Sequence, residues 1–143
     1  TRTEGFSELI RRRVVIGSFI LQKENQEKLF KNAGRVRRLI VDKMNSLFEK
    51  YDGLIMPNAG AIAPHFDEEM DRLSEKYLLL ENHLAIGNFG GFPSITIPSG
   101  IIDDMPVAVN ITGPIMSDDK VFNIAKKLEE KIGFVPLSLK EEK

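Results

Sequence analysis

The chain has 143 residues and contains neither cysteine nor tryptophan. Without cysteine it can form no disulfide and no thiolate metal site, and we expect an intracellular, cytoplasmic protein. Long apolar runs are missing too: Val14–Leu21 is the longest, and Gly17 and Ser18 interrupt it. That run is too short to cross a bilayer and no signal peptide pattern opens the chain, so we expect no membrane partner. From the start at Thr1 we expect a processed or truncated product.

Net charge is almost absent, at −1, but the two signs are unevenly placed. Residues 1–50 hold 12 Lys and Arg against 6 Asp and Glu, whereas the remainder holds 8 against 15. Two interpretations are open for this basic N-terminal segment, residues 1–50, which we call the basic front. It could face RNA or an acidic partner, or it could be the solvated surface of helices; the sequence pI of about 6.1 favours the second.

The most informative stretch is 90–114, which contains two short alternating runs. In 94–98, Ile95 and Ile97 point to one side and Ser94 and Thr96 to the other; 107–112 alternates in the same way. A period of two, rich in β-branched residues and bounded by proline and glycine, is typical of half-buried strands. The seven-residue connection 99–105 is short enough for an antiparallel pair.

The rest of the chain predicts helices that cover this sheet, together with one short buried strand at 53–57. We expect helices at about 4–22, 26–50, 68–88 and 118–132, and strands at about 53–57, 94–98 and 106–112. Asn25 is the expected N-cap of the long second helix, Ser117 caps the last helix, and Gly133 ends it. The sequence therefore predicts an α/β fold with a mixed sheet, in a single domain of residues 1–143.

The same stretch carries a family resemblance. Residues 91–100, Gly-Phe-Pro-Ser-Ile-Thr-Ile-Pro-Ser-Gly, and 104–113, Asp-Met-Pro-Val-Ala-Val-Asn-Ile-Thr-Gly, resemble two runs near the end of the amidase signature domain. The family versions read Gly-Leu-Pro-x-Ile-Ser-Val-Pro-Cys-Gly and Gly-Leu-Pro-Val-Gly-Leu-Gln-Leu-Ile-Gly. The resemblance covers nearly the whole chain but only the last third of a family member. It implies the C-terminal part of the amidase signature fold, and within the family it is strongest to the amidotransferase branch.

One departure from the family pattern follows the first strand. The family has Tyr-Asp-Val-Leu-Leu-x-Pro-Thr-x-Pro, whereas residues 51–60 of this chain read Tyr-Asp-Gly-Leu-Ile-Met-Pro-Asn-Ala-Gly. Asn58 therefore stands in place of the threonine, and the second proline is missing.

Arginine supplies the first candidate for substrate binding. Arg11, Arg12 and Arg13 point in directions about 100° apart and so spread over about 200° of a helix; at least one should lie near its buried side and need a carboxylate partner. The alternative is that all three extend into water. The resemblance implies a role for Arg13, which matches the family arginine that holds the carboxylate of a substrate glutamine.

Glu81 is the second candidate. From residues alone, a glutamate of the helix surface is favoured. The resemblance implies instead that Glu81 replaces the family aspartate that recognises the substrate's α-amino group.

The catalytic residues of the family are not recognisable in this sequence. Family members use a Ser–cis-Ser–Lys triad, with the nucleophile in a Gly-Gly-Ser-Ser-Gly-Gly segment. No Ser-Ser pair occurs here, and Phe92 follows Gly90 and Gly91. The chain also has no metal or nucleotide motif, so we expect no cofactor and no hydrolysis by this chain alone.

The resemblance implies a substrate and partners. It predicts a piece of the glutamine-hydrolysing component of a heterotrimeric, tRNA-dependent amidotransferase, in which tRNA is met through the complex while ATP and Mg²⁺ act in a partner subunit. Two alternatives stay open: a fragment of another amidase signature hydrolase, or a stand-alone helical interaction module with a basic face.

Overall fold

A computed structural model of the chain describes residues 5–63 and 84–133. Most of the helix predicted at 68–88, including Glu81, lies outside these ranges; its described end is a short helix, α5 (Ala85–Gly90). The chain divides into two compact units, Thr1–Asp42 and Lys43–Lys143, which are described separately. The expectation of a single domain therefore remains a prediction.

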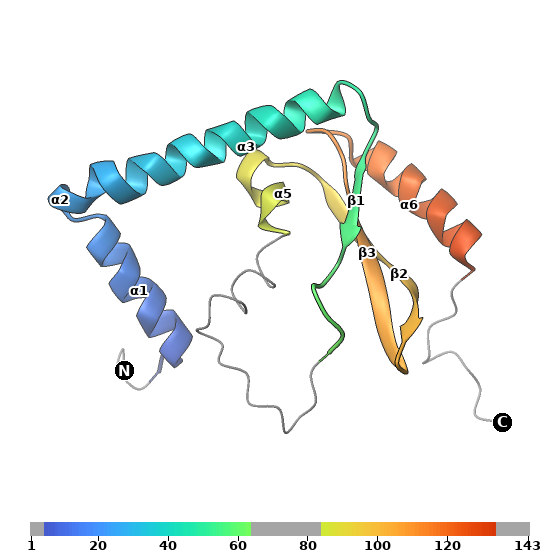
Figure 1. The fold of residues 1–143 in the computed structure, drawn as a ribbon, viewed down its shortest axis with the longest axis horizontal. Coiled ribbons are helices and arrows are strands. Elements are labelled where there is room, and N and C mark those ends of the chain that lie inside the picture. The colour runs from blue at the N-terminus through green and yellow to red at the C-terminus, as the bar shows by residue number, and fades with distance from the viewer. Residues whose placement is uncertain (1–4, 64–83, 134–143) are drawn as a thin grey trace. The chain divides into compact units, whose positions relative to one another are not determined.

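The first unit is helical (Figure 1). It contains α1 (Glu8–Ile20), α2 (Lys23–Asn25), the π-helical segment η1 (Gln26–Lys31) and the first part of α3 (Asn32–Phe48). None of its described residues is buried, although α1 is rich in large apolar side chains. The predicted helices 4–22 and 26–50 are thus confirmed in outline. The described residues of this unit form no buried core of their own.

The expected N-cap at Asn25 is wrong. The helical segment begins at Lys23 after Gln22, whose backbone is extended, and Asn25 closes that first turn. Its side chain instead donates a hydrogen bond backward to the carbonyl oxygen of Phe19, at 2.9 Å. The amide therefore serves the end of α1 rather than the start of the next helix.

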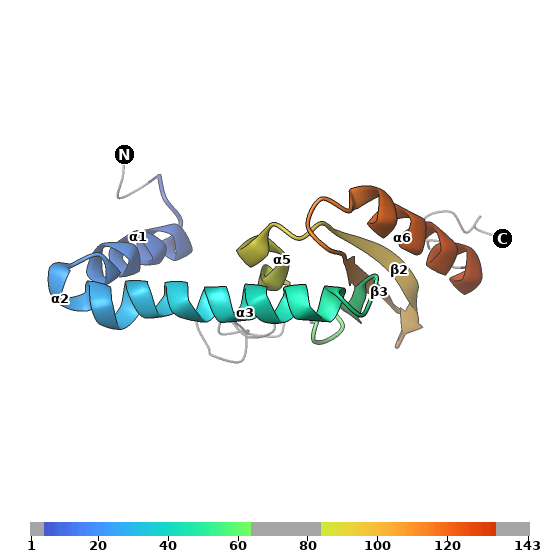
Figure 2. The same cartoon turned by 90° about the horizontal axis from the view of Figure 1, so that it is seen from above.

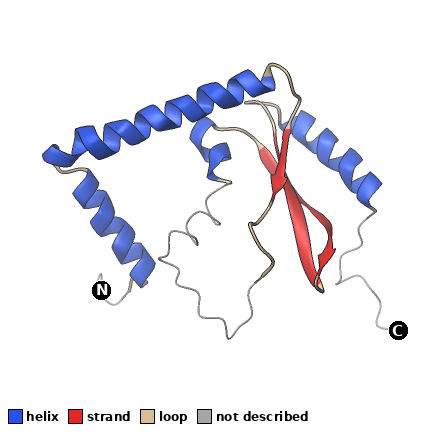
Figure 3. Ribbon diagram, in the orientation of Figure 1, coloured by secondary structure: helices blue, strands red, loops and turns tan. Residues whose placement is uncertain are grey.

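The second unit is built on a three-stranded antiparallel sheet of order β1-β3-β2 (Figure 3). Its strands are β1 (Leu54–Pro57), β2 (Ser94–Ile102) and β3 (Met105–Thr112). In the centre of the sheet, Asn110 of β3 lies opposite Met56 of β1 and Thr96 of β2. The α/β class and the antiparallel pair of β2 and β3 are confirmed. The sheet formed by the described strands is antiparallel throughout, not mixed as predicted.

The β2–β3 hairpin is longer than predicted. β2 continues past Pro98 through a register shift between Pro98 and Gly100, so the connection is only Asp103 and Asp104. Both aspartates have positive φ, 48° and 60°. Two such residues form the turn that matches the right-handed twist of a hairpin. Pro98 is tolerated inside the strand because β2 is an edge of the described sheet.

One face of the sheet carries the main core. Helix α6 (Asp118–Ile132) lies against β2 and β3 (Figures 1 and 2), and Val121 and Ala125 pack onto Ile97 and Ile111. The helix spacing of 3.6 residues and the strand spacing of two bring these four side chains together. Around them pack Ile95, Val109, Ile124, Leu128 and Ile132. The α6 members of this core recur at helical spacing and form the inner face of the helix.

The positions of both ends of α6 were predicted correctly, but the hydroxyl of Ser117 makes a different hydrogen bond from the one expected. Gly133 ends the helix in the left-handed conformation, with φ of 61°. Ser117 occupies the N-cap position but its hydroxyl does not cap the helix. It donates to the carbonyl oxygen of Pro114, at 2.7 Å, and so closes the tight segment between β3 and α6.

A second apolar contact lies at the end of α3, between Phe48 and Phe92. Met44 and Phe92 are each 5% exposed, and the rings of Phe48 and Phe92 are in contact. Phe92 follows Gly91, which ends α5 in the left-handed conformation. The buried residue of α3 is Met44, near the C-terminal end of the helix, while Val36 is exposed.

Candidate functional site

Arg13 is exposed on α1. Arg11 and Arg12 are exposed as well, so the expectation that one of the three lies near a buried side is wrong: α1 has no buried residue. No ion pair to Arg13 is found within residues 5–63 and 84–133. The guanidinium is accordingly available to a carboxylate that is not among the described side chains.

Glu81 lies outside the described residues, and it cannot be placed relative to Arg13. The predicted pair of substrate-binding residues therefore stays a prediction.

The structure brings together a polar row that the sequence did not predict as a unit. It runs across the sheet face opposite α6 and consists of Thr112 and Asn110 on β3, Thr96 on β2, and Asn58, which follows β1. Thr112 Oγ1 donates to Asn110 Oδ1 at 3.1 Å, Asn110 Nδ2 donates to Thr96 Oγ1 at 3.1 Å, and Thr96 Oγ1 donates to Asn58 Oδ1 at 2.9 Å. We call these four residues the polar ladder.

The alternation of the strands puts Thr96 on the polar side of one run and Asn110 and Thr112 on the polar side of the other. This alternation is the one signal in the sequence that pointed to the row of polar side chains. Only the register, which sets Thr96 opposite Asn110, shows that the side chains meet. Thr112 is 2% and Asn110 5% exposed, so their polar atoms need these partners.

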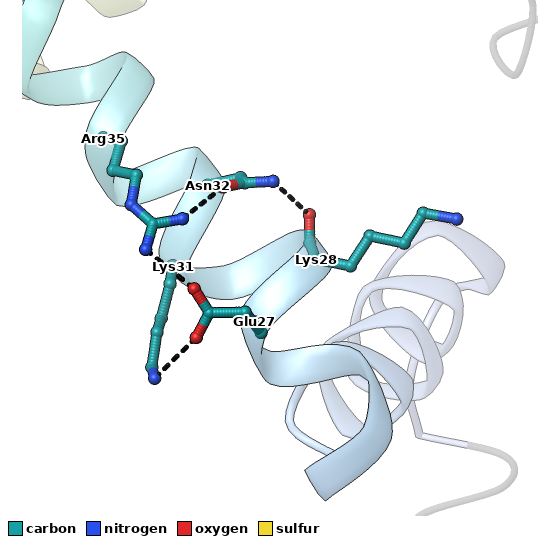
Figure 4. A network of polar contacts seen from close by, with 5 residues as sticks. All are labelled: Glu27, Lys28, Lys31, Asn32 and Arg35. Carbon is teal, nitrogen blue, oxygen red and sulfur yellow. Dashed lines mark hydrogen bonds and ion pairs between the residues drawn. The ribbon is translucent and has the colours of Figure 1, made fainter.

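The basic front of the chain is partly neutralised by its own carboxylates. Glu27 accepts hydrogen bonds from Lys31 and Arg35, each at 2.7 Å, and Asn32 Oδ1 accepts a second bond from Arg35 (Figure 4). The hydrogen bond from Lys31, followed by that from Arg35, lowers the pKa of Glu27 below its ordinary value of 4.5. This arrangement is typical of a solvated helix face and supports that interpretation over a nucleic-acid surface.

No metal site is built by the part of the chain that the structure describes: it contains no group of three His, Cys, Asp or Glu residues that could hold an ion. None of the described helices is both long and apolar enough to span a membrane.

The two runs that resemble amidase sequences lie on the hairpin of β2 and β3. The amidase family model matches residues 1–122, and the chain belongs to this family.

Among curated proteins, the chain is similar to the A subunit of glutamyl-tRNA(Gln) amidotransferase. It is 36% identical to that of Thermotoga maritima over 130 residues, which cover 91% of this chain and 27% of the relative. It is also 36% identical to its counterpart from Streptococcus uberis, over 90% of this chain and 26% of the relative. The chain thus spans about a quarter of the length of these relatives.

Solved structures agree with this assignment. The crystal structure of the Thermotoga maritima glutamyl-tRNA(Gln) amidotransferase A subunit superposes with a TM-score of 0.72 at 33% identity, covering 95% of this chain and 31% of that one. A crystal structure of an amidase superposes with a TM-score of 0.69 at 22% identity, over 90% of this chain and 30% of that one, and so shares the fold. The expected C-terminal part of the amidase signature fold is confirmed.

Proposed function

We propose that this chain forms the C-terminal part of the glutamine-hydrolysing A subunit of a tRNA-dependent amidotransferase. The observation that carries the proposal is the 36% identity to such subunits over nine-tenths of the chain. The intact enzyme would release ammonia from glutamine for the conversion of Glu-tRNA(Gln) to Gln-tRNA(Gln). Its partner subunits would bind the tRNA and use ATP and Mg²⁺, in the cytoplasm.

Within that reaction the chain contributes binding rather than bond cleavage. Arg13 holds the α-carboxylate of glutamine, because a guanidinium presents two parallel N–H donors to the two carboxylate oxygens. Glu81 holds the α-ammonium group by an ion pair. The exposed side chain of Arg13, which has no carboxylate partner among the described residues, supports this role. The nucleophile and its base come from the part of the amidase domain that the relatives contain and this chain does not cover.

Reconstitution tests the proposal. The chain is mixed with the N-terminal portion of the Thermotoga maritima relative, assembly is verified by size-exclusion chromatography, and ammonia release from glutamine is measured. We expect activity only when both pieces are present. Arg13→Ala should raise KM for glutamine about 10- to 100-fold with a smaller effect on kcat, since a charge-assisted hydrogen bond to the substrate is lost.

Arg12→Ala is the matched control, because Arg12 is the exposed neighbour of Arg13 on the same helix. It should leave KM within about twofold of the unmodified enzyme. An assembled complex that hydrolyses other amides but not glutamine would replace this proposal with a different amidase of the same family. An assembled complex without any amidase activity would overturn it.

A further inference from the structure

Asp52 and Gly53 form the only Asp-Gly pair in the sequence, which contains no Asn-Gly pair. The pair lies between the end of α3 and the start of β1. The last hydrogen bond of the helical end is donated by the backbone N–H of Tyr51, at 3.0 Å, and strand pairing begins at Leu54. The peptide group that joins Asp52 to Gly53 therefore belongs to neither element.

Both groups that could react at this peptide are accessible. The side chain of Asp52 is 80% exposed, and its ion pair with Lys120 Nζ, at 3.1 Å, is exposed as well. An exposed ion pair of this kind restrains a side chain only weakly. No acceptor for the backbone N–H of Gly53 is found in residues 5–63 and 84–133. Neither the carboxyl group of Asp52 nor the nitrogen of Gly53 is thus held by a strong contact of its own.

Glycine at position 53 favours a reaction between these two groups. It has no side chain to crowd its nitrogen, and its backbone reaches conformations that are closed to other residues. The family run quoted above has valine at this position, a residue that is branched at Cβ. The Asp-Gly pair is therefore a feature of this chain that the family pattern does not have.

We propose that Asp52 is a modification site at which isoaspartate forms spontaneously. The nitrogen of Gly53 attacks Cγ of the protonated Asp52 carboxyl group, a C–N bond forms, and the hydroxyl group leaves with the amide proton as water. The product is a five-membered succinimide ring. Water then opens the ring at one of its two carbonyl carbons. Opening at Cγ restores aspartate, whereas opening at the former main-chain carbonyl carbon gives isoaspartate.

The isomer changes the backbone at the entry to the sheet. The main chain of isoaspartate runs through Cβ and Cγ and is longer by one methylene group. The free carboxylate of Asp52 then sits on Cα, away from the position in which it meets Lys120. Because pairing of β1 with β3 begins at Leu54, the added atom lies directly before the first paired residue and weakens the attachment of β1.

The test measures isoaspartate in the intact, folded chain. The chain is incubated at neutral pH and physiological temperature, digested with trypsin, and the peptide 51–72 is examined by electron-transfer fragmentation, which distinguishes isoaspartate from aspartate at a single position. A parallel sample is incubated in guanidinium chloride. We expect isoaspartate to accumulate at Asp52 at comparable rates in both samples. A rate more than about tenfold lower in the folded chain, a barrier raised by about 1.4 kcal/mol, would show that the fold protects the pair and would overturn the proposal.

Two variants and an internal control identify the reacting pair. Asp52→Glu keeps an exposed carboxylate but needs a six-membered ring, and Gly53→Val restores the residue of the family run; each should suppress the modification. Asp104, exposed in the hairpin turn and followed by Met105, should stay unmodified in the same samples. Equal modification of Asp52 and Asp104 would overturn the role of Gly53.

The guanidinium samples keep the test of Gly53→Val independent of folding. A Cβ at Gly53 would lie 3.3 Å from Ile124 Cδ1, so this variant is compared with the original chain under denaturing conditions as well. Isoaspartate that persists there in Gly53→Val would overturn the chemical role of the glycine.

The effect on the sheet is measured after the same incubation. Urea titrations compare the original chain with Asp52→Glu before and after ageing. We expect the unfolding midpoint to fall only in the original chain, in proportion to its isoaspartate content. An aged, modified chain with an unchanged midpoint would overturn the predicted weakening of β1.

Discussion

The rings of Phe48 and Phe92 meet with their centroids 5.5 Å apart and their planes at 59°. Phe48 is the last residue of α3, and Phe92 lies between α5 and β2. Tilted aromatic pairs at this separation contribute about 0.5–1.5 kcal/mol beyond the area they bury. The contact therefore connects the end of the long helix to the segment that leads into the hairpin.

Phe92→Ala should lower the free energy of unfolding by about 3 kcal/mol, because it removes a buried ring and leaves a cavity beside Phe48. Phe122→Ala is the matched control, since Phe122 is 63% exposed on α6. Its effect should stay below about 1 kcal/mol. Urea titrations of both variants measure the difference, and equal losses would contradict the assigned contact of Phe92 with Phe48.

Replacing Gly113 or Gly34 with alanine should change the free energy of unfolding in opposite directions. A Cβ at Gly113 would collide with Val121 Cγ2 and lie 2.8 Å from Ser117 Oγ, whereas a Cβ at Gly34 meets nothing within 4 Å. Gly113→Ala should destabilise the fold by about 1–3 kcal/mol through overpacking. Gly34→Ala, inside α3, should stabilise the helix by about 0.5–1 kcal/mol. Helix content and unfolding midpoints measured by circular dichroism would test both.

The hairpin turn offers a stabilising change. Asp104 has φ of 60°, a left-handed conformation that glycine adopts without strain. Asp104→Gly should raise the free energy of unfolding by about 0.5–1 kcal/mol. Asp118→Gly serves as the contrast, because it removes a carboxylate from the first turn of α6 and should destabilise the chain. If Asp104→Gly destabilises as much as Asp118→Gly does, the turn assignment is wrong.

The ion pairs of Glu27 predict a dependence on pH. Because its folded-state pKa lies below the ordinary 4.5, the stabilisation from Lys31 and Arg35 is present above that value and is lost as the pH falls through the folded-state pKa. Carbon-13 titration of the carboxylate should give a midpoint below 4.5 that rises in Lys31→Met and in Arg35→Met. Lys28→Met should not move it, since that side chain points away from Glu27 (Figure 4). A midpoint insensitive to Lys31→Met, or one that salt at about 1 M leaves unchanged, would contradict these pairs.

Local patterns in the sequence predicted much of the second unit. The alternation of Ile95 and Ile97 predicted β2, helical spacing predicted the helix at 118–132, and Gly133 marked the end of that helix. Each of these signals is local, because the side-chain directions of a strand or helix follow from its own backbone geometry. The family motifs extended the prediction to the fold class, which the comparisons confirmed.

Other features depend on contacts between segments. The sequence did not show that β2 passes Pro98, that Asp103 and Asp104 form the turn, or that Asn25 bonds backward to Phe19. Proline and asparagine each have several permitted environments, and which one is realised depends on pairing with another strand or helix end.

The sequence by itself determined the strands, the helices and the family, since these follow from residue spacing and from motifs along one stretch of chain. It also supplied Arg13 and Glu81 as candidates. Only the tertiary structure decided that Asn58, Thr96, Asn110 and Thr112 form one ladder, because hydrogen bonds across strands depend on register. A slip of one residue between β2 and β3 would turn Thr96 away from Asn110.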